Sequence, residues 1–167
     1  PEIHSEYIAS KAPDAKSREE EIEAIGVDAE VEKSMTVFPR DAEGNPIMWD
    51  YQIKGFFKDA CGMLRKVPKT KSSGIKAYKK EIDGLVFVFD RKIPIQNYKQ
   101  IRASTAQGER IALAHSETIP AGSYIEFTIK CLKDSLMPVV KEWLDYGELR
   151  GFGQWRNSGK GCFTWKE

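Results

Sequence analysis

The sequence has little of what metal centres, disulfide frameworks and membrane spans require. Of its 167 residues, only three are cysteines and two are histidines. Cys61, Cys131 and Cys162 are far apart and form no C-x-x-C pair, so neither a zinc site nor a disulfide framework is indicated. No apolar run approaches the roughly 20 residues of a membrane helix, and there is no signal-peptide pattern. We therefore expect a cytoplasmic protein without metal, cofactor or membrane partner, with its cysteines as small buried hydrophobes.

The net charge of +1 conceals a separation of charge along the chain. Residues 1–32 hold ten acidic and three basic side chains, whereas residues 54–80 hold nine basic side chains and one acid, Asp59. Such a basic stretch indicates a polyanionic partner; the alternative is a solvated face with a flexible lysine-rich loop. We expect residues 1–32 to be peripheral. The predicted phosphate contacts are Lys54, Lys58, Arg65, Lys69 and Lys71.

Hydrophobic spacing predicts two long helices. In the first, capped by Asp50, apolar residues recur at helical spacing from Ile53 to Leu64. The second starts near Asp134 or Ser135 and should end at Gly147, a typical residue after a helix C-terminus. Shorter helices are expected from Ser17 to about Ile25 and from about Ile75 to Ile82.

Strands are expected at 35–38, at 85–89 (buried on both faces), at 124–129 and at 162–165, with a hairpin formed by 99–106 and 109–116. The length suits one domain over residues 1–167. Because the chain begins at Pro1 without a methionine, a first strand could have been lost upstream. This order predicts an α+β, ferredoxin-like fold with a mainly antiparallel sheet and helices on one face.

Residues 151–161 (GFGQWRNSGKG) form the most specific segment. Five residues separate Gly153 from Gly159, which excludes a Walker A loop, and Arg156 stands where a dinucleotide-binding loop needs its third glycine. Glycines allow a ligand to approach the backbone, the basic side chains suit phosphates, and Trp155 can stack on a base. The alternative is a tight helix-to-strand connection with Trp155 packed inward. The predicted contacts are Gly151, Gly153, Trp155, Arg156, Gly159, Lys160 and Gly161.

Three segments carry a resemblance to a known superfamily. Residues 45–58 (NPIMWDYQIKGFFK) contain a hydrophobic-Lys-Gly triplet, Ile53 to Gly55, in a helix that follows a proline-containing strand. Residues 116–127 (SETIPAGSYIEF) contain a run similar to Glu-hydrophobic-Pro-x-Gly-x-x-Phe before a late strand, and the glycine-rich segment follows the last helix. In these features the chain resembles the RAMP superfamily, the repeat-associated proteins that grip RNA in CRISPR effector complexes.

This resemblance implies an RNA-recognition-like fold with a C-terminal glycine-rich loop, and single-stranded RNA or single-stranded DNA as partner. It also implies head-to-tail assembly with itself or with other effector subunits. The chain departs from the family at residues 49–52 (WDYQ), which replace a small Gly-Ser-Ser-like turn, and it lacks room for a large thumb insertion. A divergent stand-alone member, for example one encoded by a phage, therefore fits as well as a working CRISPR subunit.

Two residues are candidates for catalysis. Some relatives cleave RNA with an aspartate ahead of the hydrophobic-Lys-Gly helix, where Asp41 stands, with Asp50 second. The alternative makes Asp41 a turn former and Asp50 a helix cap. His115 is the candidate for histidine-dependent cleavage, or else a residue beside the core.

The sequence thus favours a non-catalytic binder of single-stranded nucleic acid, with RNA as the preferred ligand. A RAMP-like endoribonuclease is one alternative. The other is a protein-interaction module that mimics or inhibits a CRISPR effector, with the acidic residues 1–32 as its docking face.

Overall fold

The computed structural model describes residues 36–98, 102–107 and 113–167, and the side chains of 36–98 and 116–167. The expected helix near Ser17 and the acidic residues 1–32 lie outside the described residues. The chain divides into two compact units. The larger unit is formed by residues 39–96 and 125–167, and the described part of the smaller unit lies in 36–38 and 97–124. The single domain over 1–167 stays a prediction.

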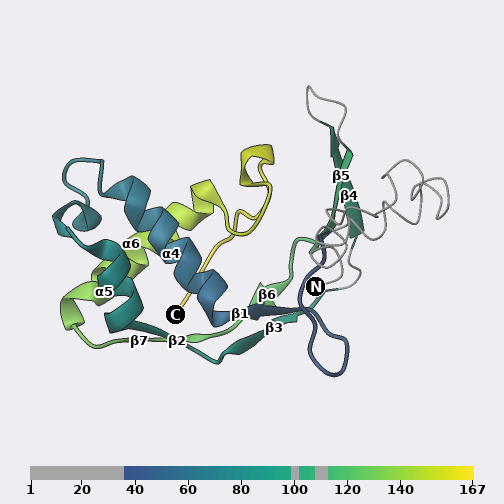
Figure 1. Ribbon diagram of the computed structural model, residues 1–167, viewed down its shortest axis with the longest axis horizontal. Coiled ribbons are helices and arrows are strands. Elements are labelled where there is room, and N and C mark those ends of the chain that lie inside the picture. Colours follow the sequence, from purple (N-terminus) through teal and green to yellow (C-terminus); the bar gives the residue numbers. More distant parts are fainter. Residues whose placement is uncertain (1–35, 99–101, 108–112) are drawn as a thin grey trace, which may run out of the picture. The chain divides into compact units, whose positions relative to one another are not determined.

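The strands of the larger unit form small antiparallel sheets (Figure 1). β1 (Ile47–Trp49) pairs with β3 (Lys92–Gln96), and β2 (Val86–Phe89) pairs with β7 (Thr128–Cys131). The third strand beside β3 is β6 (Tyr124–Ile125), where the chain passes from the smaller unit to the larger one. The chain passes directly from one sheet to the other twice, because β2 leads into β3 and β6 leads into β7.

Three helices lie on the same side of these strands: α4 (Asp50–Leu64), α5 (Tyr78–Leu85) and α6 (Met137–Arg150) (Figure 1). Short 3-10 helices are η1 (Lys71–Gly74), η2 (Asp134–Leu136) and η3 (Arg156–Ser158). The α+β class predicted from the sequence is confirmed. The expected helix at 75–82 is present as α5, although it begins and ends three residues later.

The core of the larger unit forms between α4 and α6. The apolar stripe predicted for α4 is buried at Ile53, Phe56, Phe57 and Ala60. α6 meets it with Trp143, which is fully buried, and the rings of Phe57 and Trp143 lie 5.5 Å apart. Removing apolar surface from water contributes roughly 25 cal/mol per Å² to the free energy of folding. Large buried rings such as these therefore supply the main favourable contribution.

The predicted start of α4 was wrong by one residue and the predicted end of α6 by three. The N-cap of α4 is Trp49, and Asp50 is already the first helical residue. The side chain of Gln52 caps the N-terminus of α4 instead, because its Oε1 accepts the backbone N–H of Trp49 at 2.8 Å. α6 continues past Gly147 to Arg150 and ends at Gly151, whose φ is 72°.

Gly147 lies where two aromatic rings approach the backbone of α6 closely. A Cβ atom on this residue would overlap the ring of Phe163 and would lie 2.8 Å from Cζ of Phe56. The close approach of these two rings to the helix backbone therefore requires glycine, and this requirement is invisible in the local sequence.

The predicted strand at 85–89 is β2, but only one of its faces is buried. Val86 and Val88 point inward, whereas Phe89 is 49% exposed. The predicted strand at 124–129 is divided into β6 and β7. Of the predicted strand at 35–38, the described residues show a single bridge between Thr36 and Ser116.

The predicted closing strand at 162–165 does not form. This segment has no strand partner in the described chain, and its side chains attach it to the helices instead. Trp165 Nε1 donates to Asp145 Oδ1 at 2.9 Å, and the Phe163 and Phe56 rings meet edge to face at 5.6 Å. Side-chain contacts with the helices thus hold this segment in place of backbone hydrogen bonds to a neighbouring strand.

In the smaller unit, β4 (Arg102–Gln107) and β5 (Leu113–Thr118) form an antiparallel hairpin with Gln107 opposite Leu113. A hairpin is therefore present as predicted, but its strands differ from the expected 99–106 and 109–116, and Gln107, expected in the turn, belongs to β4. Phe38 adds to this unit, because its N–H donates to Glu117 Oε2 at 2.8 Å.

Two glycine-to-alanine variants should have opposite effects on stability. Gly147→Ala should lower the free energy of unfolding by about 1–3 kcal/mol, because the new methyl group overlaps packed rings. Gly84→Ala, near the end of α5, has nothing within 4 Å of the new Cβ and should gain about 0.5–1 kcal/mol from helix propensity. Urea unfolding followed by far-ultraviolet circular dichroism measures both, and an unchanged midpoint for Gly147→Ala would contradict the packing described.

Candidate nucleic-acid interface

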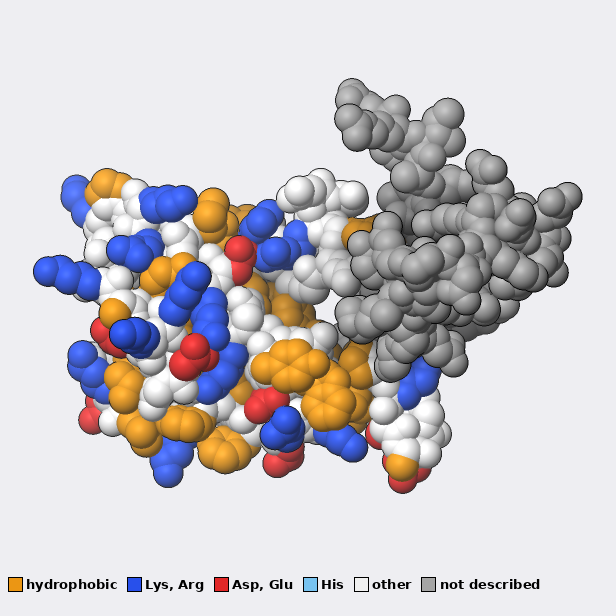
Figure 2. Space-filling view, in the orientation of Figure 1, with side chains coloured by type: hydrophobic (Ala, Val, Ile, Leu, Met, Phe, Trp, Pro, Cys, Tyr) orange, Lys and Arg blue, Asp and Glu red, His pale blue; other side chains and the backbone are white. Residues whose placement is uncertain are grey.

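The exposed side of α4 carries a row of basic residues. Lys54, Lys58 and Arg65 are separated by four and seven residues, a spacing that places them on one side of a helix. The buried stripe occupies the other side of α4. Figure 2 shows lysine and arginine side chains gathered over α4, η1 and α5, with fewer acidic side chains between them.

Two of these cations are directed toward α5 and β2. Lys58 Nζ lies 2.6 Å from Asp83 Oδ1, and Lys54 Nζ lies 3.3 Å from the Asp83 carbonyl oxygen. Lys54 also lies over the ring of Phe87, 4.9 Å from its centroid. The Lys58 and Asp83 side chains are 32% and 56% exposed. An exposed ion pair contributes at most about 1 kcal/mol, so a ligand phosphate can compete with Asp83 for Lys58.

A concavity of about 590 Å³ opens beside this row. Three basic side chains line it, those of Lys58, Arg65 and Lys66, together with the acid Asp59, Met63 and Tyr78. The Arg65 guanidinium lies 5.3 Å from the Tyr78 ring centroid. Gly62 also lines the concavity, and a Cβ there would be 3.1 Å from the Tyr78 hydroxyl oxygen. The concavity therefore combines positive charge with an aromatic ring.

The lysine-rich segment is held in place by a residue that sequence reasoning missed. Glu142 on α6 accepts the Lys71 N–H at 2.7 Å, the Ser72 N–H at 3.0 Å and the Ser72 hydroxyl at 2.6 Å. Ser72 is fully buried, and its Oγ accepts the indole N–H of Trp143 at 2.9 Å. Lys69 and Lys71 remain exposed on this ordered turn. No local signal marked Glu142, because its partners lie about 70 residues away.

The glycine-rich loop is closed by its own backbone. The Phe152 N–H donates to the Gly161 carbonyl at 2.9 Å. Gly151 and Gly161 adopt φ values of 72° and 84°, and a Cβ on Gly161 would overlap Phe152 O. These two glycines are therefore required for loop closure. Gly153 and Gly159 also have positive φ values, but a Cβ on either would meet no atom within 4 Å.

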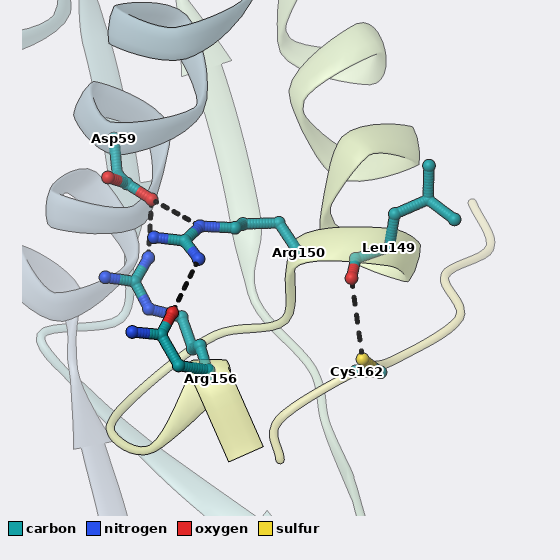
Figure 3. A network of polar contacts seen from close by, with 6 residues as sticks. Asp59, Leu149, Arg150, Arg156 and Cys162 are labelled. Carbon is teal, nitrogen blue, oxygen red and sulfur yellow. Dashed lines mark hydrogen bonds and ion pairs between the residues drawn. The ribbon is translucent and has the colours of Figure 1, made fainter. Parts of the chain in front are cut away.

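Two arginines converge on one oxygen of Asp59 (Figure 3). Arg156 Nη1 pairs with Asp59 Oδ2, and Arg150 Nε lies 3.6 Å from the same oxygen. Arg150 Nη1 also donates to Asn157 Oδ1 at 3.3 Å. Asp59, the only acid within residues 54–80, thus fastens the loop to α4. Arg156 is 27% exposed and engaged in this pair.

The remaining predicted contacts of the loop lie beside one another. Trp155 is half-buried, with a left-handed φ of 58°. Lys160 Nζ lies over its ring, 4.9 Å from the centroid. The structure therefore brings Trp155 and Lys160 together within the loop and places Arg156 against α4.

Asp41 and His115, the candidate catalytic residues, lie in different units of the chain, Asp41 in the larger and His115 in the smaller. Asp41 forms a turn: its Oδ1 accepts the N–H groups of Glu43 and Asn45 at 3.1 and 2.7 Å. Desolvation acts to raise the pKa of Asp41, but hydrogen bonds from Asn45, Glu43 and Gly44 outweigh it and lower the pKa. The His115 side chain lies outside the described side chains; its backbone pairs with Thr105.

The cysteines differ in environment. Cys61 is fully buried, as expected, whereas Cys131 is half-buried and Cys162 is exposed. The expectation that all three would be buried was therefore wrong for Cys162, whose Sγ lies 3.8 Å from the Leu149 carbonyl (Figure 3). Burial raises the pKa of the Cys61 and Cys131 thiols, which keeps them protonated.

Neither a metal cluster nor a membrane helix is found in the described part of the chain. Within those residues, no three His, Cys, Asp or Glu side chains are grouped as metal ligands. None of the described helices is long and apolar enough to cross a membrane.

Comparison with known proteins assigns no family: no protein-family model and no curated protein matches the sequence. The resemblance to the RAMP superfamily therefore stays a prediction.

Removing the Asp59 carboxylate should release the glycine-rich loop. Asp59→Ala leaves the guanidinium groups of Arg150 and Arg156 without their shared partner, at a cost of about 1 kcal/mol for a partly exposed pair. Limited trypsin digestion should then cleave after Arg156 and Lys160 several-fold faster. Asp134→Ala is the matched control, because Asp134 is an exposed acid in η2. Equal cleavage rates in both variants would show that Asp59 does not hold the loop.

Proposed function

We propose that this protein binds single-stranded nucleic acid, with RNA as the preferred ligand, as a non-catalytic RAMP-like protein. The observation that carries the proposal is the basic stretch 54–80, folded into one exposed surface around the concavity lined by Lys58, Arg65 and Lys66. A surface of this kind suits a phosphate backbone, because each neutralised phosphate releases bound counterions. The predicted contacts Lys69, which precedes η1, and Lys71, which is its first residue, extend this surface.

The glycine-rich loop is the second part of the proposed interface. Trp155 offers an aromatic ring and Lys160 a cation at the same place. Arg156 would exchange Asp59 for a phosphate when the strand is bound, which resembles the exchange proposed for Lys58 and Asp83. Both exchanges replace one charge-assisted contact by another, so their net cost is small.

A ferredoxin-like, RNA-recognition-like arrangement belongs to the same proposal. Helices on one side of small antiparallel sheets support it. The βαββαβ order would add a strand after α6, and residues 151–167 form none. Head-to-tail assembly, a role beside CRISPR effector subunits and a cytoplasmic location likewise remain proposals.

Binding should depend strongly on salt and on the row of cations along α4. Fluorescence anisotropy of a labelled RNA of about 30 nucleotides should give a dissociation constant that rises steeply with salt. The double variant Lys58→Ala, Arg65→Ala should weaken binding and reduce the slope of log K against log salt by about 0.7 for each phosphate that is no longer neutralised. Lys133→Ala, an exposed lysine between β7 and η2, should leave both unchanged. No binding at low salt would overturn the proposal.

The loop has its own test. Arg156→Ala and Lys160→Ala should each weaken RNA binding by about three- to tenfold if they contact phosphates, as losing a charge-assisted hydrogen bond would. Single-stranded DNA of matching sequence should bind less tightly. The same samples, run on a denaturing gel, should contain intact RNA. Shortened RNA that disappears with Asp41→Ala or His115→Ala would instead establish the endoribonuclease alternative.

A further inference from the structure

We infer that Tyr51, in the first turn of α4, stacks on an unpaired base of the bound strand. One turn further along, Gly55 has no side chain, which lets the strand approach the helix backbone closely. The inference rests on the proposed function and extends it, because it names the part of the ligand, an unpaired base, that this end of the basic row takes.

Tyr51 is an exposed aromatic ring that the fold has already oriented. It stacks on Trp49 with an interplanar angle of 12° and a centroid distance of 6.2 Å, yet it remains 59% exposed. Trp49 is fixed by β1, where it lies opposite Lys92, and by its hydrogen bond to Gln52. The Lys92 ammonium lies 5.7 Å from the Trp49 ring centroid. A ring held this way loses little conformational freedom when a base stacks on it.

Tyr51 is also in line with the cations of α4. It precedes Lys54, Lys58 and Arg65 by three, seven and fourteen residues, which places all four on one side of the helix. At about 1.5 Å per residue, this row is about 21 Å long. A single nucleic-acid strand carries both bases and phosphates, so one base can stack on the ring while the phosphates contact the row of cations. An apolar peptide would have no use for the cations.

Gly55 has no structural reason to be glycine. It lies in the interior of α4, it is exposed, and its φ is helical. A Cβ placed on it would meet no atom within 4 Å, in contrast to Gly62 beside Tyr78 and Gly147 beside Phe163. Glycine in a helix interior is destabilising relative to alanine, so neither packing nor backbone geometry explains it. Its place between Tyr51 and Lys58 leaves the backbone uncovered in the middle of the row, where a ligand can come close.

The test compares two ligands with the same phosphates. Oligouridylate of about 12 nucleotides, within the range of known single-strand sites, is compared with an abasic ribose-phosphate strand of the same length. The protein should bind oligouridylate more tightly. Tyr51→Leu should weaken that binding about tenfold while changing binding of the abasic strand little, and Tyr51→Phe should keep the affinity. Tyr124→Leu, which removes another exposed tyrosine, is the control and should change neither.

Gly55→Ala provides a second, independent measurement. It should raise the melting temperature by a few degrees and yet weaken binding of oligouridylate several-fold. Gly84→Ala, the matched helix glycine with open space around its Cβ, should raise the melting temperature without affecting binding.

The outcomes separate this inference from the proposed function. If both strands bind equally and Tyr51→Leu has no effect, base stacking at Tyr51 is wrong although backbone binding stands. If Gly55→Ala binds as the native protein does, the close approach is wrong. If neither strand binds at low salt, the proposed function fails and this inference fails with it.

Discussion

The packing of α4 against α6 around Trp143 determines where the candidate ligand contacts lie. Phe57 fills one side of the indole, and the buried Ser72 accepts the indole N–H. Because Ser72 belongs to η1, this single buried hydrogen bond connects the core to the lysine-rich segment. The carboxylate of Glu142 then occupies the N–H groups at the start of η1. The basic surface is thus an extension of the core, and its cations are displayed on a rigid support.

The few acids near this surface have a common role. Asp59, Asp83 and Glu142 each contact a basic or donor group of the same region and fix its position. The contacts of Asp59 and Asp83 are partly exposed, so they hold the cations without neutralising them strongly. Each such pair holds its cation in one side-chain conformation. Acids of this region therefore serve as local supports for its basic side chains.

What the sequence could predict was set by local periodicity. The apolar stripe of α4 from Ile53 to Ala60, the buried face of α6 and the presence of a hairpin follow from spacing, and the structure contains them, although Met63 at the end of the predicted stripe is exposed. The role of Gly147 was missed, because it depends on Phe163 and Phe56 approaching from other segments. The partner of Arg156 was missed for the same reason, since Asp59 lies 97 residues away. The prediction of a closing strand was wrong because the alternating residues at 162–165 indicate only an extended chain. Whether another strand lies beside that chain depends on the whole fold.

The closure of the glycine-rich loop has a consequence for how this protein can change over time. The hydrogen bond between Phe152 and Gly161 joins the two ends of the loop through backbone atoms alone. Side chains of the enclosed segment can therefore be exchanged without opening this closure, apart from Arg156 and Asn157, which contact Asp59 and Arg150. The sequence of the loop can thus diversify over time while Gly151 and Gly161 preserve its closure.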